Sequence, residues 1–140
     1  MAINVYLNFN GNCRQAVEFY ADVFDTEAPH IMTFGDMPPD NDYPLPEKAK
    51  ELVMHTQMLL QGTRIMFSDV LPHMKHTEGN NISLAVVLND ESELRRLYGR
   101  LAEEGKVQME LQETSWSSCY ASLTDKFGIE WQLNYEEEPV

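Results

Sequence analysis

The stretch LQETSWSSCYASLTDKFGIEWQLNY, residues 111–135, decides how this chain folds. It contains two runs of alternating, partly aromatic residues on either side of Asp125-Lys126-Phe127-Gly128. Glycine adopts a positive φ without a steric penalty, so a short segment from Asp to Gly is typical of a tight reversal. We therefore predict that Cys119–Leu123 and Ile129–Asn134 pair as antiparallel strands.

The second of these strands has one apolar and one polar face, because neighbouring side chains of a strand point to opposite sides of the sheet. Its residues divide into Ile129, Trp131 and Leu133 on the apolar face and Glu130, Gln132 and Asn134 on the polar face. We expect the apolar face to pack in the core and the polar face to line a pocket.

The same reasoning predicts the remaining elements. Alternating and β-branched residues predict strands over 3–9, 29–35, 52–60, 63–69, 81–88 and 107–114. Apolar residues at helical spacing predict two helices, which start near Cys13 and Glu91. Proline-rich residues 36–51 predict a long loop with one helical turn near its end.

Two sequence patterns predict how the helices begin. Asn12 with Gln15, and Asp90 with Glu93, match the capping box, in which side chains satisfy the free backbone N–H groups of the first turn. Each helix should lie on the outer face of its sheet, because each has a single apolar stripe.

In order, the predicted elements read βαβββ twice. The chain of 140 residues is one domain's length, so we predict a single α+β domain with one module at about 1–71 and a second at about 80–136. The net charge of −13 argues against a nucleic-acid partner, and no apolar run has the roughly 20 residues that a membrane span needs. We expect a cytoplasmic protein with Cys13 and Cys119 as free thiols.

Several motifs resemble one known family. They are Tyr6-Leu7-x-Phe9-x-Gly11-Asn12-Cys13-Arg14, Gly35-Asp36-Met37-Pro38, Ser68-Asp69, Gln112-Glu113-Thr114-x-Trp116 and Asp125-Lys126-Phe127-Gly128-x-x-Trp131. In this order they resemble the PhnB-like branch of the vicinal oxygen chelate superfamily, which includes glyoxalase I, bleomycin-resistance proteins and extradiol dioxygenases. The resemblance implies paired βαβββ modules in a cupped sheet around a cavity, commonly in homodimers.

The chain departs from the family pattern after Trp116, where Ser117 and Ala121 replace glycines and Ser115 replaces an aromatic residue. Members of the branch often have a demethylubiquinone methyltransferase label. The sequence does not support that activity, because it has no glycine-rich strand-to-helix loop for a nucleotide cofactor.

Glyoxalase-type members of the superfamily bind a divalent metal with His and Glu side chains. The resemblance places the equivalent positions near Val5, Met66, Ser83 and Gln132. Valine and methionine do not bind hard cations, and the other two side chains are neutral. We therefore expect no metal at the usual site and no other cofactor.

Other residues are candidates for a site. His55 and Gln57 share one face of a predicted strand, and His55 is either a partly buried, satisfied histidine or an acid–base group. Glu113 is the second catalytic candidate. Trp116 and Tyr120 either pack in a core or interface or stack on a flat ligand. His73 and His76 are candidates for a metal-ligand pair, but they lie in a polar stretch without a carboxylate partner, where we expect a solvated loop.

Three classes of function remain. The first is binding of a small, partly aromatic molecule without metal, through His55, Gln57, Ser83, Trp116, Tyr120, Gln132 and Asn134. The neutral amides and hydroxyl in this set favour an uncharged or weakly polar ligand. The second is an enzyme of lyase, isomerase or oxygenase type that uses His55 and Glu113, with or without a relocated metal. The third is a dimeric scaffold without a ligand.

Overall fold

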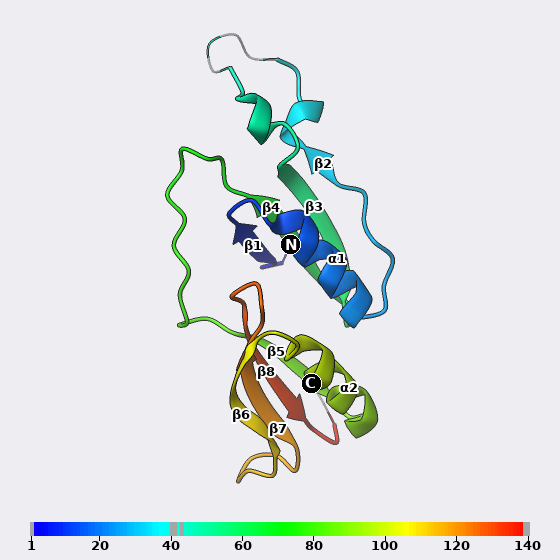
Figure 1. Ribbon diagram of the computed structural model, residues 1–140. Coiled ribbons are helices and arrows are strands. Elements are labelled where there is room, and N and C mark those ends of the chain that lie inside the picture. Colours follow the sequence, from blue (N-terminus) through cyan, green and yellow to red (C-terminus); the bar gives the residue numbers. More distant parts are fainter. Residues whose placement is uncertain (1, 40–41, 43, 139–140) are drawn as a thin grey trace. The chain divides into compact units, whose positions relative to one another are not determined.

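The computed structural model describes residues 2–39, 42 and 44–138, and it divides into two compact units at Thr77 and Glu78. The first unit contains β1 (Val5–Phe9), α1 (Cys13–Val23), β2 (Met32–Thr33), β3 (Val53–Leu60) and β4 (Thr63–Asp69). The second contains β5 (Leu84–Leu88), α2 (Glu91–Leu101), β6 (Lys106–Gln112), β7 (Tyr120–Thr124) and β8 (Glu130–Tyr135). Each unit is therefore a βαβββ module (Figure 1).

The two sheets have the same topology. Their strand orders are β1-β4-β3-β2 and β5-β8-β7-β6. In each sheet the first strand runs parallel to the last, and the other neighbours are antiparallel. The predicted α+β fold with two βαβββ modules is confirmed.

One helix covers one face of each sheet, as its single apolar stripe predicts. In the first unit the ring of Tyr20 on α1 stacks on Phe67 of β4 with centroids 6.0 Å apart, and Phe67 stacks on Phe9 of β1 at 6.4 Å. In the second unit the fully buried leucines of α2 contact the sheet side that contains Trp131 and Leu133. Each described unit has one α-helix, so the opposite face of its sheet is not covered by an α-helix of the same unit.

The reversal predicted at 125–128 connects β7 to β8. Gly128 has φ +87°, and the Asp125 side chain accepts hydrogen bonds from the backbone N–H groups of Phe127 and Ile129 at 2.8 and 3.1 Å. The second carboxylate oxygen accepts the indole N–H of Trp131 at 2.8 Å. One buried aspartate thus fixes both the turn and the first core aromatic of β8.

The predicted capping box at Asn12 is wrong, because the Asn12 side chain makes no capping hydrogen bond. The carboxylate of Asp69 instead accepts the backbone N–H groups of Gly11 and Cys13 at 2.8 and 3.0 Å. At Asp90 one of the two hydrogen bonds of the predicted capping box is confirmed: the Asp90 side chain accepts the backbone N–H of Glu93 at 3.1 Å.

Several predicted bounds also change. The strand predicted over 29–35 is reduced to Met32–Thr33 and is followed by a 3-10 turn at Phe34–Asp36. The helical turn in the proline-rich loop is the 3-10 segment Glu47–Ala49, and residues 40, 41 and 43 of this loop lie outside the described part. In that described part, no helix is both long and apolar enough to cross a membrane.

Candidate functional site

The helix-free face of the first sheet is called the first open face. Its side chains alternate with the buried ones along each strand and stand beside one another in the strand register. They are Tyr6 and Asn8 of β1, Arg64, Met66 and Ser68 of β4, His55, Gln57 and Leu59 of β3, and Met32 of β2. The predicted pair His55 and Gln57 thus lies on the same face.

His55 has a partner that the sequence did not indicate. The Tyr6 hydroxyl lies 3.1 Å from His55 Nδ1, and the two ring centroids are 5.8 Å apart. The residues are 49 positions apart in the chain and on strands separated by β4, so no local pattern connects them. The contact depends on the pairing of β1 with β4, because this pairing leaves a single strand between Tyr6 on β1 and His55 on β3.

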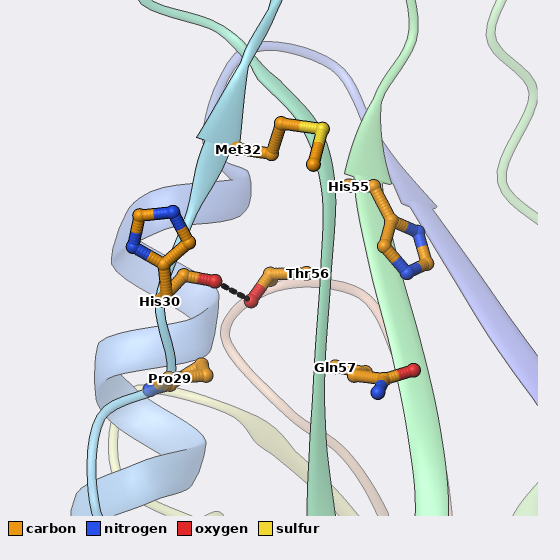
Figure 2. Close-up of a pocket in the computed structure, with 6 residues that line it drawn as sticks. All are labelled: Pro29, His30, Met32, His55, Thr56 and Gln57. Atoms are coloured by element: carbon orange, nitrogen blue, oxygen red, sulfur yellow. Dashed lines mark hydrogen bonds between the residues drawn. The ribbon is translucent and has the colours of Figure 1, made fainter.

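His55 and Gln57 also line a hollow of about 320 Å³, the lower end of the range for small-molecule pockets. Its other lining residues are Pro29, His30, Met32 and Thr56. Figure 2 shows His55 and Gln57 extending in the same direction from β3, with Met32 above them. The Thr56 hydroxyl donates to the backbone carbonyl of His30 at 2.8 Å, which holds the segment before β2 against β3.

The helix-free face of the second sheet, the second open face, brings four predicted residues together. The Tyr120 hydroxyl donates to Gln132 Oε1 at 2.7 Å, and Gln132 Nε2 donates to the Ser83 hydroxyl at 2.8 Å. Trp116 meets Tyr120 edge to face with ring centroids 5.2 Å apart, and Trp116 is 61% exposed. An exposed indole beside a chain of neutral hydrogen-bonding groups suits a flat, partly polar molecule.

Asn134 lies on this face next to Tyr120 in the strand register. Its amide nitrogen donates to Glu136 at 3.0 Å, whereas its buried Oδ1 has no hydrogen-bond partner within the described residues. The face also contains the carboxylate of Glu130, which is next to Thr124 in the strand register. Glu130 accepts from the Thr124 hydroxyl at 2.8 Å, and the Thr124 hydroxyl accepts from the Gln108 amide at 2.8 Å.

The other candidates lie in loops or are buried. Glu113 is exposed just after β6 in the second unit, whereas His55 belongs to the first, so neither unit contains the predicted catalytic pair. His73 is exposed, as expected for a solvated loop. His76 is half-buried, and its Nε2 lies 3.1 Å from the carbonyl oxygen of Asn8, which corrects that expectation for His76. Cys119 is buried, and burial raises the pKa of its thiol.

The positions equivalent to superfamily metal ligands do not fit a divalent metal. Val5 pairs with buried Ile65 on the helix-covered side, whereas its neighbour Tyr6 is the open-face residue beside Met66. Met66 offers a soft thioether, and Ser83 and Gln132 offer neutral oxygens. Among the residues placed by the structure, no three His, Cys, Asp or Glu side chains gather as a metal-binding group.

Comparison with known proteins adds the family. A family model described as 3-demethylubiquinone-9 3-methyltransferase matches residues 1–134. This chain belongs to the PhnB-like family.

Relatives of this PhnB-like chain match it over nearly its whole length. Protein YjdN of Escherichia coli is 30% identical over 143 residues, which covers 96% of this chain and 95% of YjdN. The crystal structure of PA1353 from Pseudomonas aeruginosa has a TM-score of 0.84 at 32% identity and covers 99% of both chains. A PhnB protein from Bacillus cereus has a TM-score of 0.75 at 27% identity, covering 97% of this chain and 100% of its own.

The fold extends to more distant proteins. The fosfomycin resistance protein FosX from Listeria monocytogenes has a TM-score of 0.59 at 11% identity, covering 96% of this chain and 89% of FosX. At this identity the likeness concerns the fold alone. It places the PhnB-like chain among proteins with the glyoxalase/bleomycin resistance fold.

Proposed function

We propose that this PhnB-like protein binds a small, partly aromatic molecule on the open faces of its sheets, without a metal. The observation that carries the proposal is the hollow of about 320 Å³ at the edge of the first open face, where Pro29, His30 and Thr56 line it together with His55, Gln57 and Met32. Such a site combines apolar surface with a few oriented polar groups, which is the usual composition of a small-molecule site.

The second open face supports the same class of ligand. Trp116 and Tyr120 present an aromatic surface, and the Tyr120–Gln132–Ser83 chain presents neutral donors and acceptors. Neutral groups orient a ligand without the large desolvation penalty of a buried charge. His55, Gln57, Ser83, Trp116, Tyr120, Gln132 and Asn134 are the proposed ligand-binding residues.

The test is a binding measurement by calorimetry with each small molecule that copurifies with the protein. His55→Ala and Gln132→Ala should each weaken binding by about 1–3 kcal/mol, the effect of one lost buried hydrogen-bond partner. His73→Ala is the matched control for His55, because His73 is exposed outside the hollow of the same unit. Equal affinity of His55→Ala and His73→Ala would contradict the proposal.

The Tyr6–His55 contact favours a second candidate function, proton transfer at a carbon next to a carbonyl. When His55 Nδ1 donates to the Tyr6 oxygen, Nε2 is free to accept a proton and to return it. Deuterium incorporation from D2O into simple aromatic ketones, followed by proton NMR, tests this function. Exchange catalysed by wild type and lost in His55→Gln supports an isomerase-type enzyme, and no exchange above the solvent rate argues against it.

We further propose a homodimer, on the family resemblance and the exposed aromatic side chain of Trp116. Light scattering at micromolar concentration should give twice the chain mass of 16.1 kDa. A monomer mass would refute this assembly.

A further inference from the structure

Arg64 lies on the first open face in an unusual environment. Its Nη2 is 3.3 Å from the thioether sulfur of Met66, two residues along β4. A thioether is a weak acceptor, so most of the five N–H donors of the guanidinium are left for another group. Among the residues that the structure places, Arg64 has no ion pair.

The strands around Arg64 contain few acidic side chains. The protein has 23 acidic and 10 basic side chains, and among the described residues Lys50, Arg95, Arg96, Arg100 and Lys126 each pair with a glutamate. The nine side chains of the first open face include no carboxylate. The one acidic residue in the strands of this unit is Asp69, which is buried on the helix-covered side against backbone N–H groups.

A carboxylate-free face with an unpaired guanidinium favours an anionic ligand group locally, against the net charge of −13 of the whole chain. Gln57 stands beside Met66 in the register, so its amide adds a neutral donor next to the guanidinium. The row that contains His55 and Ser68 is four residues from Arg64 along β4, about 13 Å at 3.3 Å per residue. Because Arg64 reaches over Met66, the gap that remains suits a molecule of one or two fused rings.

We propose that the first open face binds a carboxylate-bearing aromatic molecule, with Arg64 as the residue that selects the negative charge. The carboxylate accepts from Arg64 and Gln57, and the ring lies over Met66 and Tyr6 toward the hollow beside His55. This inference rests on the proposed binding function and replaces the expectation of an uncharged ligand, which considered the amides and hydroxyl without Arg64.

The experiment uses 2-naphthoate and 2-naphthamide, two probes of equal ring size that differ in charge. Each is titrated into the isotope-labelled full chain, and affinity is read from the backbone amide signals of Gln57 and Met66 in two-dimensional NMR. The variants are Arg64→Gln and the control Lys75→Gln, which removes one positive charge from an exposed loop position of the same unit. Both changed side chains are exposed, so neither should disturb the fold.

We expect wild type and Lys75→Gln to bind 2-naphthoate at least about fivefold more tightly than 2-naphthamide, because hydrogen bonds to charged groups are stronger than neutral ones. Arg64→Gln should abolish that preference, because its affinity for 2-naphthoate falls to its affinity for 2-naphthamide. Equal affinity of wild type for both probes would overturn the selection of charge but not the binding function. Failure of both probes to shift any signal of the first open face would overturn both.

Discussion

Replacing Asp125 with asparagine tests whether one buried carboxylate fixes the hairpin between β7 and β8. Asp125 is 3% exposed, and its two oxygens accept three N–H groups, from Phe127, Ile129 and Trp131. Asparagine keeps only one oxygen. If that oxygen stays with the two backbone groups, the amide nitrogen faces the indole N–H, and a buried donor loses its partner.

The expected cost follows from these contacts. An unsatisfied buried donor costs about 1–3 kcal/mol, and the two remaining hydrogen bonds each weaken when the acceptor loses its charge. We therefore expect Asp125→Asn to lower the free energy of unfolding by about 2–4 kcal/mol. Asp90→Asn is the matched control, since asparagine caps a helix as well as aspartate does and the loss should stay below about 0.5 kcal/mol.

Urea unfolding followed by tryptophan fluorescence measures the effect, because Trp131 is 3% exposed and its emission changes when the hairpin opens. Far-UV circular dichroism then follows the Trp131→Phe variant and the double variant. The double-mutant cycle should give a coupling of about 1–2 kcal/mol between Asp125 and the indole. A loss equal to that of Asp90→Asn, or a cycle without coupling, would refute the role assigned to this carboxylate.

Four further predictions concern stability and thiol chemistry. Asp90→Ala should lower the free energy of unfolding in urea by about 1 kcal/mol and Asn12→Ala by less than about 0.5 kcal/mol, because of the two only Asp90 makes a capping hydrogen bond. Equal losses would contradict this. Gly62→Ala should cost about 1 kcal/mol by the same assay, since Gly62 has φ +82°, and an unchanged midpoint would contradict it. Burial raises the thiol pKa of both Cys13 and Cys119 above the ordinary value of 9.0, so iodoacetamide should label them quickly only after unfolding. For the same reason the unfolded state ionises first as the pH rises past 9.0, and stability should fall there.

Local patterns predicted the elements whose signals lie within one segment. The alternation in residues 129–134 gave the faces of β8, and glycine at 128 gave the turn before it, because both depend on neighbouring residues. Contacts between residues that are distant in the sequence were harder to predict. Asp69 replaces Asn12 as the partner of the first turn of α1, and no local pattern connects residues more than 50 positions apart.

The candidate site shows the same division. His55 and Gln57 share a face because they are two residues apart on one strand. Tyr6 and Arg64 were missed because their importance depends on which strands are neighbours and on the charges that those strands lack. The family resemblance indicates a metal-ligand position near Val5, and the pairing of Val5 with Ile65 shows that one residue separates the helix-covered face from the open face.

Native mass spectrometry of freshly purified protein tests the central proposal most directly. We predict that the 16.1 kDa chain retains a small organic molecule, that His55→Ala loses it, and that His73→Ala keeps it. Protein that carries no organic molecule, or that holds one divalent metal ion per chain after dialysis against a chelator, would contradict the account.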